Sequence, residues 1–203
     1  GLLKPGNHQI ILLNLNDTPA ISHAIISHFQ KYGRVFGLCH SAGVVETLPL
    51  NLFKADVFHE MININLIAGI ELCKTIGRRD IIEENGGAFL FISSIDSLVG
   101  KPGQIAYSAS KGAVNSAVRS MALELARKKI RVNSLSPGVV RTPMTIKAFS
   151  RLSKQQVEKL EESFPLGFGN PEDVARAAAF LLAPQNSWIT GTNMVIDGGY
   201  TAS

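Results

Sequence analysis

Short apolar runs alternate along the chain with longer stretches in which apolar residues recur at helical spacing. Five runs have the length and aliphatic content of strands, and they lie at 9–15, 35–40, 88–94, 130–136 and 193–197. Runs that are apolar at successive residues are typical of strands buried on both faces. Alternating with helices, they predict an α/β fold in which helices cover both faces of a parallel sheet.

The stretches between these runs predict helices, which lie at 18–31, 56–79, 105–128 and from 170–173 to the proline at 184. The first begins with good cap chemistry, since Asp17 precedes it and Pro19 stands in its first turn. Gly33 marks its end. The helix over 105–128 carries small residues at helical spacing, which permit close packing against another helix.

The segment 143–169 follows a Pro-Gly turn and is rich in Ser, Phe and Lys. Its pattern is irregular or only loosely helical. We therefore expect a mobile flap that covers a substrate site.

Composition narrows the class of protein. The 203 residues are 45% hydrophobic and 18% charged, which predicts a single compact domain over 1–203. The formal net charge of +4 comes without a block of five or six like charges, so nucleic acid is not an expected partner. No apolar run approaches the roughly 18 residues of a membrane span.

The cysteines and the first residues of the sequence carry little functional signal. Cys39 and Cys73 lack metal-binding or redox spacing, so we expect no metal site and read both as buried apolar fillers. The opening GLLKPGN has no signal-peptide pattern, which predicts a cytoplasmic protein.

Candidate chemistry gathers where strands end, because ligands of open α/β sheets bind beyond the carboxyl ends of the strands. Ser94 ends the run 88–94, and Tyr107 and Lys111 follow one helical turn apart on one helix face. We expect the ammonium to lower the pKa of the phenol from its usual value of about 10, so that it can exchange a proton with a substrate. Ser94 can bond the same substrate oxygen, and Asn65 can hold a water that connects Lys111 to solvent.

The motifs form a series, which reads LNLND (13–17), HSAG (40–43), NINL (63–66), FISS (91–94), YSASK (107–111), NSLSPGVVRTPM (133–144) and TGTNMVIDGG (190–199). From residue 9 to 200 the chain resembles the short-chain dehydrogenase/reductase family, particularly its 3-oxoacyl-carrier-protein-reductase-like members. The resemblance implies a Rossmann-type doubly wound parallel sheet. It also implies hydride transfer between NADP or NAD and a carbonyl or secondary alcohol.

The resemblance implies site residues as well. The catalytic tetrad would be Asn65, Ser94, Tyr107 and Lys111, with Tyr107 as general acid in the reducing direction. The nicotinamide carboxamide would be held by Pro137, Gly138, Val140 and Thr142. The other cofactor contacts would be made by Asn14 and Leu15 at the adenine, Ser41, Ala42 and Gly43 near a ribose, and Tyr107 with Lys111 at the nicotinamide ribose.

HSAG departs from the family's usual NNAG, because His40 and Ser41 replace two asparagines. Ala42 and Gly43 still permit close backbone approach to a ribose. We expect His40 to be a buried or half-buried histidine with its hydrogen bonds satisfied rather than a catalytic group. The same is expected of the remaining histidines, which are His8, His23, His28 and His59.

The family's opening βαβ unit, with its GxxxGxG turn, has no counterpart here, and none of the 18 glycines forms that motif. The family's strands 1 and 2 are therefore absent from this sequence, and we expect it to omit part of the natural chain. Alternatively, the run 9–15 pairs directly with 35–40 in a shortened sheet. A catalytically silent scaffold or binding subunit, lacking the phosphate loop, is the alternative function.

The expected substrate is a small carbonyl or alcohol. The basic residues 127–129 and Arg131 could meet an acyl carrier protein, although a solvated helix end is the favoured interpretation. By resemblance, the helices 56–79 and 105–128 would pair in a homotetramer or dimer. The choice between NAD and NADP stays open.

Overall fold

The structure is a computed structural model that describes residues 8–150 and 152–202, and within them four parallel strands form one sheet. In spatial order the strands are β1 (Gly37–His40), β2 (Gly87–Ile92), β3 (Ile130–Pro137) and β4 (Asn193–Ile196). The opening segment 1–7, from which the cytoplasmic location is predicted, lies outside the described residues. The doubly wound α/β fold is confirmed.

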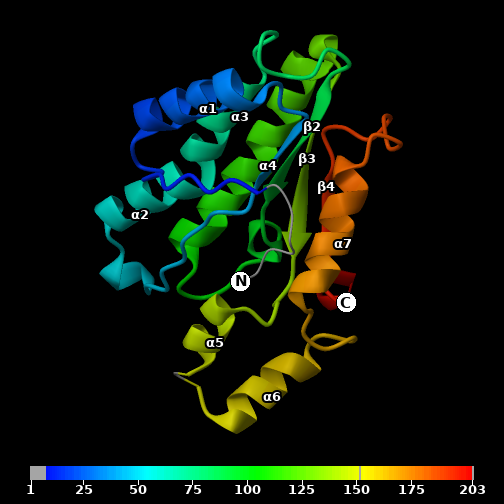
Figure 1. Cartoon of the computed structure of the whole chain (residues 1–203). Helices are drawn as coiled ribbons and strands as arrows, with labels where there is room; N and C mark the ends of the chain where they lie inside the picture. The colour runs from blue at the N-terminus through cyan, green and yellow to red at the C-terminus, as the bar shows by residue number, and fades with distance from the viewer. Residues whose placement is uncertain (1–7, 151, 203) are drawn as a thin grey trace.

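Helices cover both faces of this sheet (Figure 1). One face carries α1 (Thr18–Tyr32), α2 (Ala55–Ile62), a π-helical turn (Asn63–Ile67), α3 (Ala68–Ile76) and α4 (Ile105–Leu125). The other face carries α7 (Pro171–Leu182), while α5 (Pro143–Phe149) and α6 (Lys154–Glu162) extend beyond the end of β3. Short 3₁₀ turns lie at Leu50–Leu52, Ile95–Ser97, Ala126–Lys128 and Tyr200–Ala202.

Successive residues of β2 supply the cores on the two faces of the sheet. Phe89 and Phe91 pack in the larger apolar cluster, with residues of α3 and α4 such as Val114. Leu90 packs with Leu181 of α7 in the second cluster. The alternation follows from the two-residue repeat of a strand, and it explains why β2 is apolar at every position.

The helix-start signals act as the sequence predicts. Asp17 caps α1 by accepting a hydrogen bond from the Ala20 N–H at 3.1 Å. Gly33 ends that helix with a φ of 89°, a conformation that favours glycine. The expected helix over 56–79 ends at Ile76, and a π turn that the pattern did not predict interrupts it.

The prediction of a strand over 9–15 is wrong. Residues 8–14 form coil, and Ile10 and Leu12 are 79% and 92% exposed. Within the described part of the chain β1 pairs with β2 alone, so the proposed pairing of 9–15 with 35–40 does not form. An apolar run becomes a strand only when a neighbour takes up its backbone hydrogen bonds, and this run has no such neighbour.

Cys73 is buried as expected, but Cys39 is exposed. Cys39 lies on the edge strand β1, whose neighbour on the sheet is β2. The helix α7 packs mainly against β2 and β3, so the Cys39 side of β1 has little cover. An edge position therefore overrides the burial that an apolar strand pattern predicts.

The predicted flap is more regular than its pattern indicated. The helices α5 and α6 both begin with capping boxes, formed by Thr142 with Thr145 and by Ser153 with Gln156. Behind them Phe164 stacks on Tyr200 at 4.5 Å between ring centres. Residue 151 lies outside the described residues, and the mobility of the segment stays a prediction. Among the described helices, none is long and apolar enough to cross a membrane.

Candidate active site

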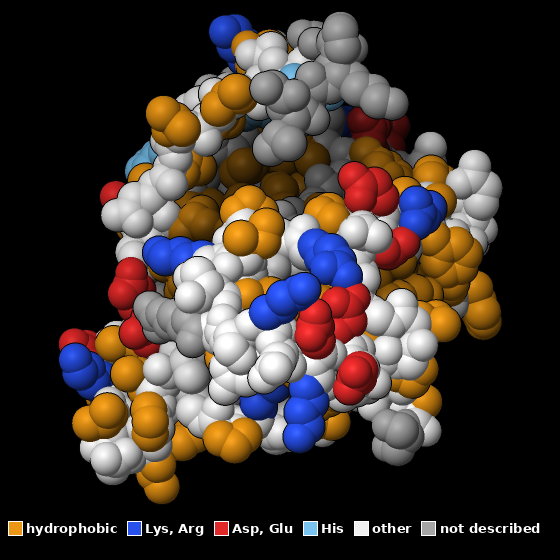
Figure 2. All heavy atoms as spheres, turned by 90° about the horizontal axis from the view of Figure 1, so that it is seen from below, with side chains coloured by type: hydrophobic (Ala, Val, Ile, Leu, Met, Phe, Trp, Pro, Cys, Tyr) orange, Lys and Arg blue, Asp and Glu red, His pale blue; other side chains and the backbone are white. Residues whose placement is uncertain are grey.

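The candidate site lies at the carboxyl ends of the strands. Ser94 follows β2, Tyr107 and Lys111 stand near the start of α4, and Asn65 lies in the π turn. Figure 2 views the molecule from the side of α5 and α6, and it shows this face hollowed, with hydrophobic side chains lining the hollow. The fold thus brings residues from three distant parts of the chain to one edge of the sheet.

Ser94, Tyr107 and Lys111 come together in the structure. Ser94 is close enough to the Tyr107 hydroxyl to lower its pKa, and the Lys111 Nζ lies 5.7 Å from the centre of the Tyr107 ring. Ser94 and Lys111 are 8% and 4% exposed. The Lys111 Nζ also donates a hydrogen bond to the Ile92 carbonyl at 2.7 Å, which fixes the ammonium beneath the site.

The electrostatics differ from the expectation at Tyr107. Burial raises the pKa of Tyr107 to about 12, a hydrogen bond from Ser94 opposes this, and the Asp96 carboxylate raises the pKa further. Burial also lowers the pKa of Lys111 to about 8. The expected lowering of the Tyr107 pKa by Lys111 is not found, because loss of hydration dominates and the ammonium bonds the Ile92 carbonyl instead.

Asn65 ties the loop after β1 to α4. Its Oδ1 accepts a hydrogen bond from the Val44 N–H at 2.8 Å, and its Nδ2 donates to the Val44 carbonyl at 3.1 Å. The second Nδ2 hydrogen goes to the Ser110 Oγ at 3.0 Å. Because both amide hydrogens are taken, a water at Asn65 would have to donate to Oδ1. The water link to Lys111 stays a prediction.

The loop 41–43 adjoins these residues. A Cβ on Gly43 would lie 3.3 Å from the Asn65 Oδ1 and 3.5 Å from the Lys111 Nζ, so this backbone borders the tetrad. Ser41 and Ala42 precede it in the same loop after β1. A group that contacted Lys111 would therefore find glycine backbone beside it, as the expected ribose contact requires.

Close packing explains the glycine of the Pro-Gly turn at the end of β3. A Cβ on Gly138 would lie 2.9 Å from the Asp197 Cα and 3.0 Å from the Phe164 ring. Packing against the segment after β4 therefore requires this glycine, whether or not a planar ring also approaches Pro137. The expected carboxamide contact here stays a prediction.

Thr142 and Val140 organise the start of α5. The Thr142 Oγ1 accepts a hydrogen bond from the Thr145 N–H at 3.3 Å, and the Val140 carbonyl accepts one from the Thr145 Oγ1 at 2.6 Å. A ligand amide that reached Thr142 would share its hydroxyl with this cap.

Asn14 and Leu15 lie in the coil before α1. The Asn14 Oδ1 accepts a hydrogen bond from the Asn16 N–H at 3.1 Å, and its carbonyl accepts one from the Asp17 N–H at 3.0 Å. This turn leads into the helix cap. The adenine role of the two residues stays a prediction.

The residues present fit one half of a nicotinamide dinucleotide. Lys111 and the Gly43 backbone offer a buried cation and a close approach for a ribose next to Tyr107. No glycine-rich turn of the GxxxGxG type stands among the described residues to offer backbone amides to a pyrophosphate. The fit is therefore to the nicotinamide end of the cofactor.

The sequence did not single out two residues that bear on the site. Ser110 positions Asn65, and its place inside YSASK was the available signal. Asp96 acts on the Tyr107 pKa, and the signal was an acidic residue directly after the Ser-Ser strand end. Within the described residues, no group of three or more His, Cys, Asp or Glu side chains could hold a metal ion.

The histidines differ from one another. His40 is 4% exposed, and its Nε2 donates to the Ile64 carbonyl at 3.1 Å, which agrees with the expected satisfied histidine. His8, His23 and His59 are exposed, contrary to expectation, because they lie on the coil before α1 or on outward faces of helices. His28 is half-buried beside Tyr32.

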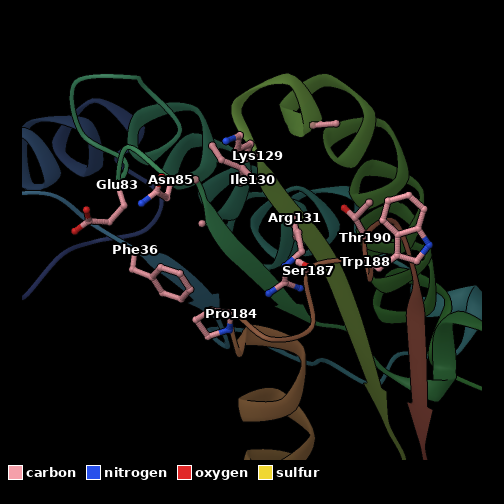
Figure 3. A pocket seen from close by; sticks show the side chains of 13 residues that line it. Phe36, Glu83, Asn85, Lys129, Ile130, Arg131, Pro184, Ser187, Trp188 and Thr190 are labelled. Carbon is pink, nitrogen blue, oxygen red and sulfur yellow. The ribbon is translucent and has the colours of Figure 1, made fainter.

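A cavity of about 800 Å³ lies at the opposite, amino ends of the strands. Figure 3 shows Phe36, Pro184 and Arg131 around it. Because Ser94 and Tyr107 lie at the carboxyl ends, this cavity does not belong to the candidate active site.

The comparisons with known proteins agree with this geometry. A family profile described as enoyl-(acyl carrier protein) reductase matches residues 2–201. The 3-oxoacyl-[acyl-carrier-protein] reductase of Thermotoga maritima is 35% identical over 96% of this chain and 78% of its own length. The chain belongs to the short-chain dehydrogenase/reductase family. A human 3-oxoacyl-[acyl-carrier-protein] reductase is 39% identical over 89% of this chain and 74% of its own length.

Solved structures of the same family superpose well. ElxO with NADP bound has a TM-score of 0.84 at 29% identity, over 94% of this chain and 77% of its own. A gluconate 5-dehydrogenase from Burkholderia cenocepacia, in complex with NADP and tartrate, has a TM-score of 0.87 at 26% identity, over 94% and 74%. This short-chain dehydrogenase/reductase is thus an NAD(P)-dependent oxidoreductase of the class acting on CH–OH or carbonyl groups.

Proposed function

We propose that this enzyme reduces a small carbonyl compound, or oxidises the matching secondary alcohol, with Tyr107 as the proton-transfer group. The observation that carries the proposal is the half-buried Tyr107, with Ser94 close enough to act on its hydroxyl and the Lys111 Nζ 5.7 Å from the centre of its ring. A phenol whose pKa lies near 12 holds its proton at neutral pH, which is the state that a general acid needs.

In the reducing direction the substrate oxygen sits between the Ser94 and Tyr107 hydroxyls. A nicotinamide cofactor held beside Lys111 and the loop 41–43 would supply the hydride for the new C–H bond at the carbonyl carbon. As negative charge grows on the oxygen, Ser94 donates a hydrogen bond to it and Tyr107 gives it a proton. The Lys111 ammonium stabilises the resulting phenolate until solvent returns the proton.

The relatives support this chemistry and leave the cofactor open. ElxO was solved with NADP, whereas a 4-hydroxyisoleucine dehydrogenase of 30% identity was solved with NADH. The selecting residues of the family lie in the unit that has no counterpart in this sequence. We therefore propose NADP or NAD, held at its nicotinamide end by Tyr107, Lys111 and the loop 41–43.

The basic residues after α4 give little support to a carrier-protein substrate. The Arg131 guanidinium is buried and donates to carbonyls at the end of α7, and the Lys128 Nζ donates to the Gly77 carbonyl at 2.7 Å. Arg131 and Lys128 thus bond the ends of other helices, α7 and α3, and do not form the solvated helix end that the sequence favoured. We accordingly propose a free small carbonyl or alcohol as substrate.

A homo-oligomer is proposed as well, with α4 and the helices α2 and α3 at the contact. Exposed apolar residues on α4 support it, since Ile105 and Leu123 are 44% and 79% exposed. Sedimentation should give a dimer or tetramer, and a monomer at all concentrations would contradict the proposal. The cytoplasmic location stays a prediction.

The second candidate function is a silent scaffold or binding subunit, which the lack of a glycine-rich phosphate turn favours. Titration with NADPH and NADH, followed by assay of carbonyl-dependent cofactor oxidation, separates the two. Saturable binding with turnover supports the enzyme. A folded full natural chain that binds neither dinucleotide supports the scaffold.

A further inference from the structure

The helix that carries Asn65 changes its hydrogen-bond spacing at the site. In an α-helix each N–H bonds the carbonyl four residues earlier, so Ala68 would bond Ile64. In the π turn the Ala68 N–H bonds the Asn63 carbonyl instead, five residues back. The change in spacing takes the Ala68 N–H away from the Ile64 carbonyl, directly before the buried Asn65.

His40 bonds this carbonyl. Its Nε2 lies 3.1 Å from the Ile64 oxygen, and because a carbonyl only accepts, Nε2 carries the hydrogen. The imidazole is 4% exposed, and burial and the positive charge of Lys111 lower its pKa. The ring is therefore a neutral imidazole with a fixed tautomer, placed edge-on to Phe91 at 5.6 Å between ring centres.

We propose that His40 is a positioning residue, which fixes the π turn through the Ile64 carbonyl and thereby places Asn65 in the active site. Asn65 directly follows the carbonyl that His40 holds. From there Asn65 hydrogen-bonds the Val44 backbone and the Ser110 hydroxyl. These bonds join the loop after β1 to α4, the helix of Tyr107 and Lys111. An effect of His40 on turnover rests on the proposed function, whereas its fixing of the π turn does not.

The space around the imidazole supports the proposal. A Cβ on Gly69 would lie 2.8 Å from the His40 Cδ2 and 2.5 Å from the Phe91 ring. The ring at position 40 therefore fits because residue 69, two residues after the π turn, has no side chain. The two residues work as a pair, in which the glycine leaves room for the donor to the Ile64 carbonyl.

Three variants test the role of the Nε2 hydrogen. His40→Phe keeps a ring against Phe91 and removes the donor, His40→Gln restores a donor, and His59→Phe is a control on the exposed face of α2. We expect His40→Phe to speed hydrogen exchange of the amides of residues 65–69 and of the Asn65 side chain at least tenfold. We expect His40→Gln to stay within about threefold of the wild type and the β2 amides to be unaffected.

Exchange at 65–69 that is equal in His40→Phe and wild type would overturn the proposal, and so would a His40→Gln variant as fast as His40→Phe. Should His40→Phe fail to fold, the tautomer of the wild-type ring decides. Nitrogen NMR of His40 is expected to show hydrogen on Nε2 from pH 7 to 9, and a hydrogen on Nδ1 instead would refute the proposal.

Turnover separates this inference from the proposed function. In an active enzyme, His40→Phe should lower kcat about tenfold with little change in the KM for the cofactor, and His40→Gln should recover most of it. A wild-type protein without turnover would reject the proposed function. The role of His40 would then be decided by the hydrogen exchange and by the tautomer of its ring.

Discussion

The Lys111 ammonium lies 5.7 Å from the centre of the Tyr107 ring, but its hydrogen bond goes to the Ile92 carbonyl at 2.7 Å. The ammonium is therefore held beside the Tyr107 ring by the backbone and not by a bond to the phenol oxygen. The arrangement leaves Tyr107 protonated at neutral pH, with a cation close enough to stabilise the phenolate once the proton has left.

The first prediction concerns Tyr107→Phe. Loss of the hydroxyl removes the proton donor, so turnover should fall by about 10²–10⁴-fold while the fold is retained. Carbonyl-dependent NADPH or NADH oxidation measures the rate, and circular dichroism checks the fold. Tyr32→Phe, at an exposed tyrosine of α1, is the matched control and should keep wild-type activity. Appreciable turnover in Tyr107→Phe would reject the proposed acid.

The second prediction concerns Lys111 and the pH dependence of stability. The folded protein lowers the Lys111 pKa from 10.5 to about 8. Between these values the unfolded state binds the proton that the folded state has released, so this group makes stability rise with pH. Relative to Lys111→Met, the wild-type free energy of unfolding should increase from pH 8 to 10.5 by up to ~3 kcal/mol.

Urea unfolding of both proteins at pH 7, 8, 9, 10 and 10.5 measures this difference. Lys74→Met is the matched control, because the Lys74 side chain is 69% exposed and lies on the neighbouring helix α3. The difference in free energy of unfolding between Lys74→Met and the wild type should not change in this way with pH. A flat difference for Lys111→Met would show that the folded protein does not disfavour the buried ammonium.

The third prediction concerns the glycine beside His40. Gly69→Ala places a Cβ 2.5 Å from the Phe91 ring and 2.8 Å from His40, and overpacking of this kind costs about 1–3 kcal/mol. Gly100→Ala is the control, because a Cβ there meets nothing within 4 Å. Thermal unfolding should separate the two variants clearly. Equal melting temperatures would indicate that the helix shifts to admit the methyl group.

Much of the fold could be predicted because the signals are local. The runs at 35–40, 88–94, 130–136 and 193–197 each overlap a strand of the sheet, and the cap at Asp17 starts α1. In each case the periodicity or the cap chemistry is present in neighbouring residues, and the tertiary structure agrees with it.

The failures arise where a distant partner decides. The run 9–15 has strand composition, but no strand in the described part of the chain pairs with it. Cys39 is exposed because β1 is an edge, which its own residues do not encode. The π turn after Ile62 depends on packing against His40 and is not visible in the apolar pattern.

The candidate site shows the same division. Spacing along one helix was enough to place Tyr107 beside Lys111, and the order of strand and helix was enough to bring Ser94 to them. The direction of the Tyr107 pKa shift could not be predicted, because it depends on burial and on Asp96. Charge alone suggested a solvent-facing role for Arg131, whereas its carbonyl partners lie about 50 residues away.

The last prediction concerns this buried arginine. The Arg131 guanidinium is 8% exposed and donates hydrogen bonds to four carbonyls at and beyond the end of α7, which belong to Leu181, Leu182, Ala183 and Ile189. In Arg131→Met these carbonyls lose a charged donor away from water, so we expect a loss of about 3 kcal/mol in the free energy of unfolding.

Arg176→Met is the matched control, because the Arg176 side chain is 72% exposed and pairs with Asp173 on the surface of α7. Surface pairs of this kind contribute under about 1 kcal/mol. Urea unfolding of both variants, with hydrogen exchange of the α7 amides, measures the contrast. If Arg131→Met were as stable as Arg176→Met, water would be reaching the carbonyls at the end of α7, and the cavity of Figure 3 would be its route.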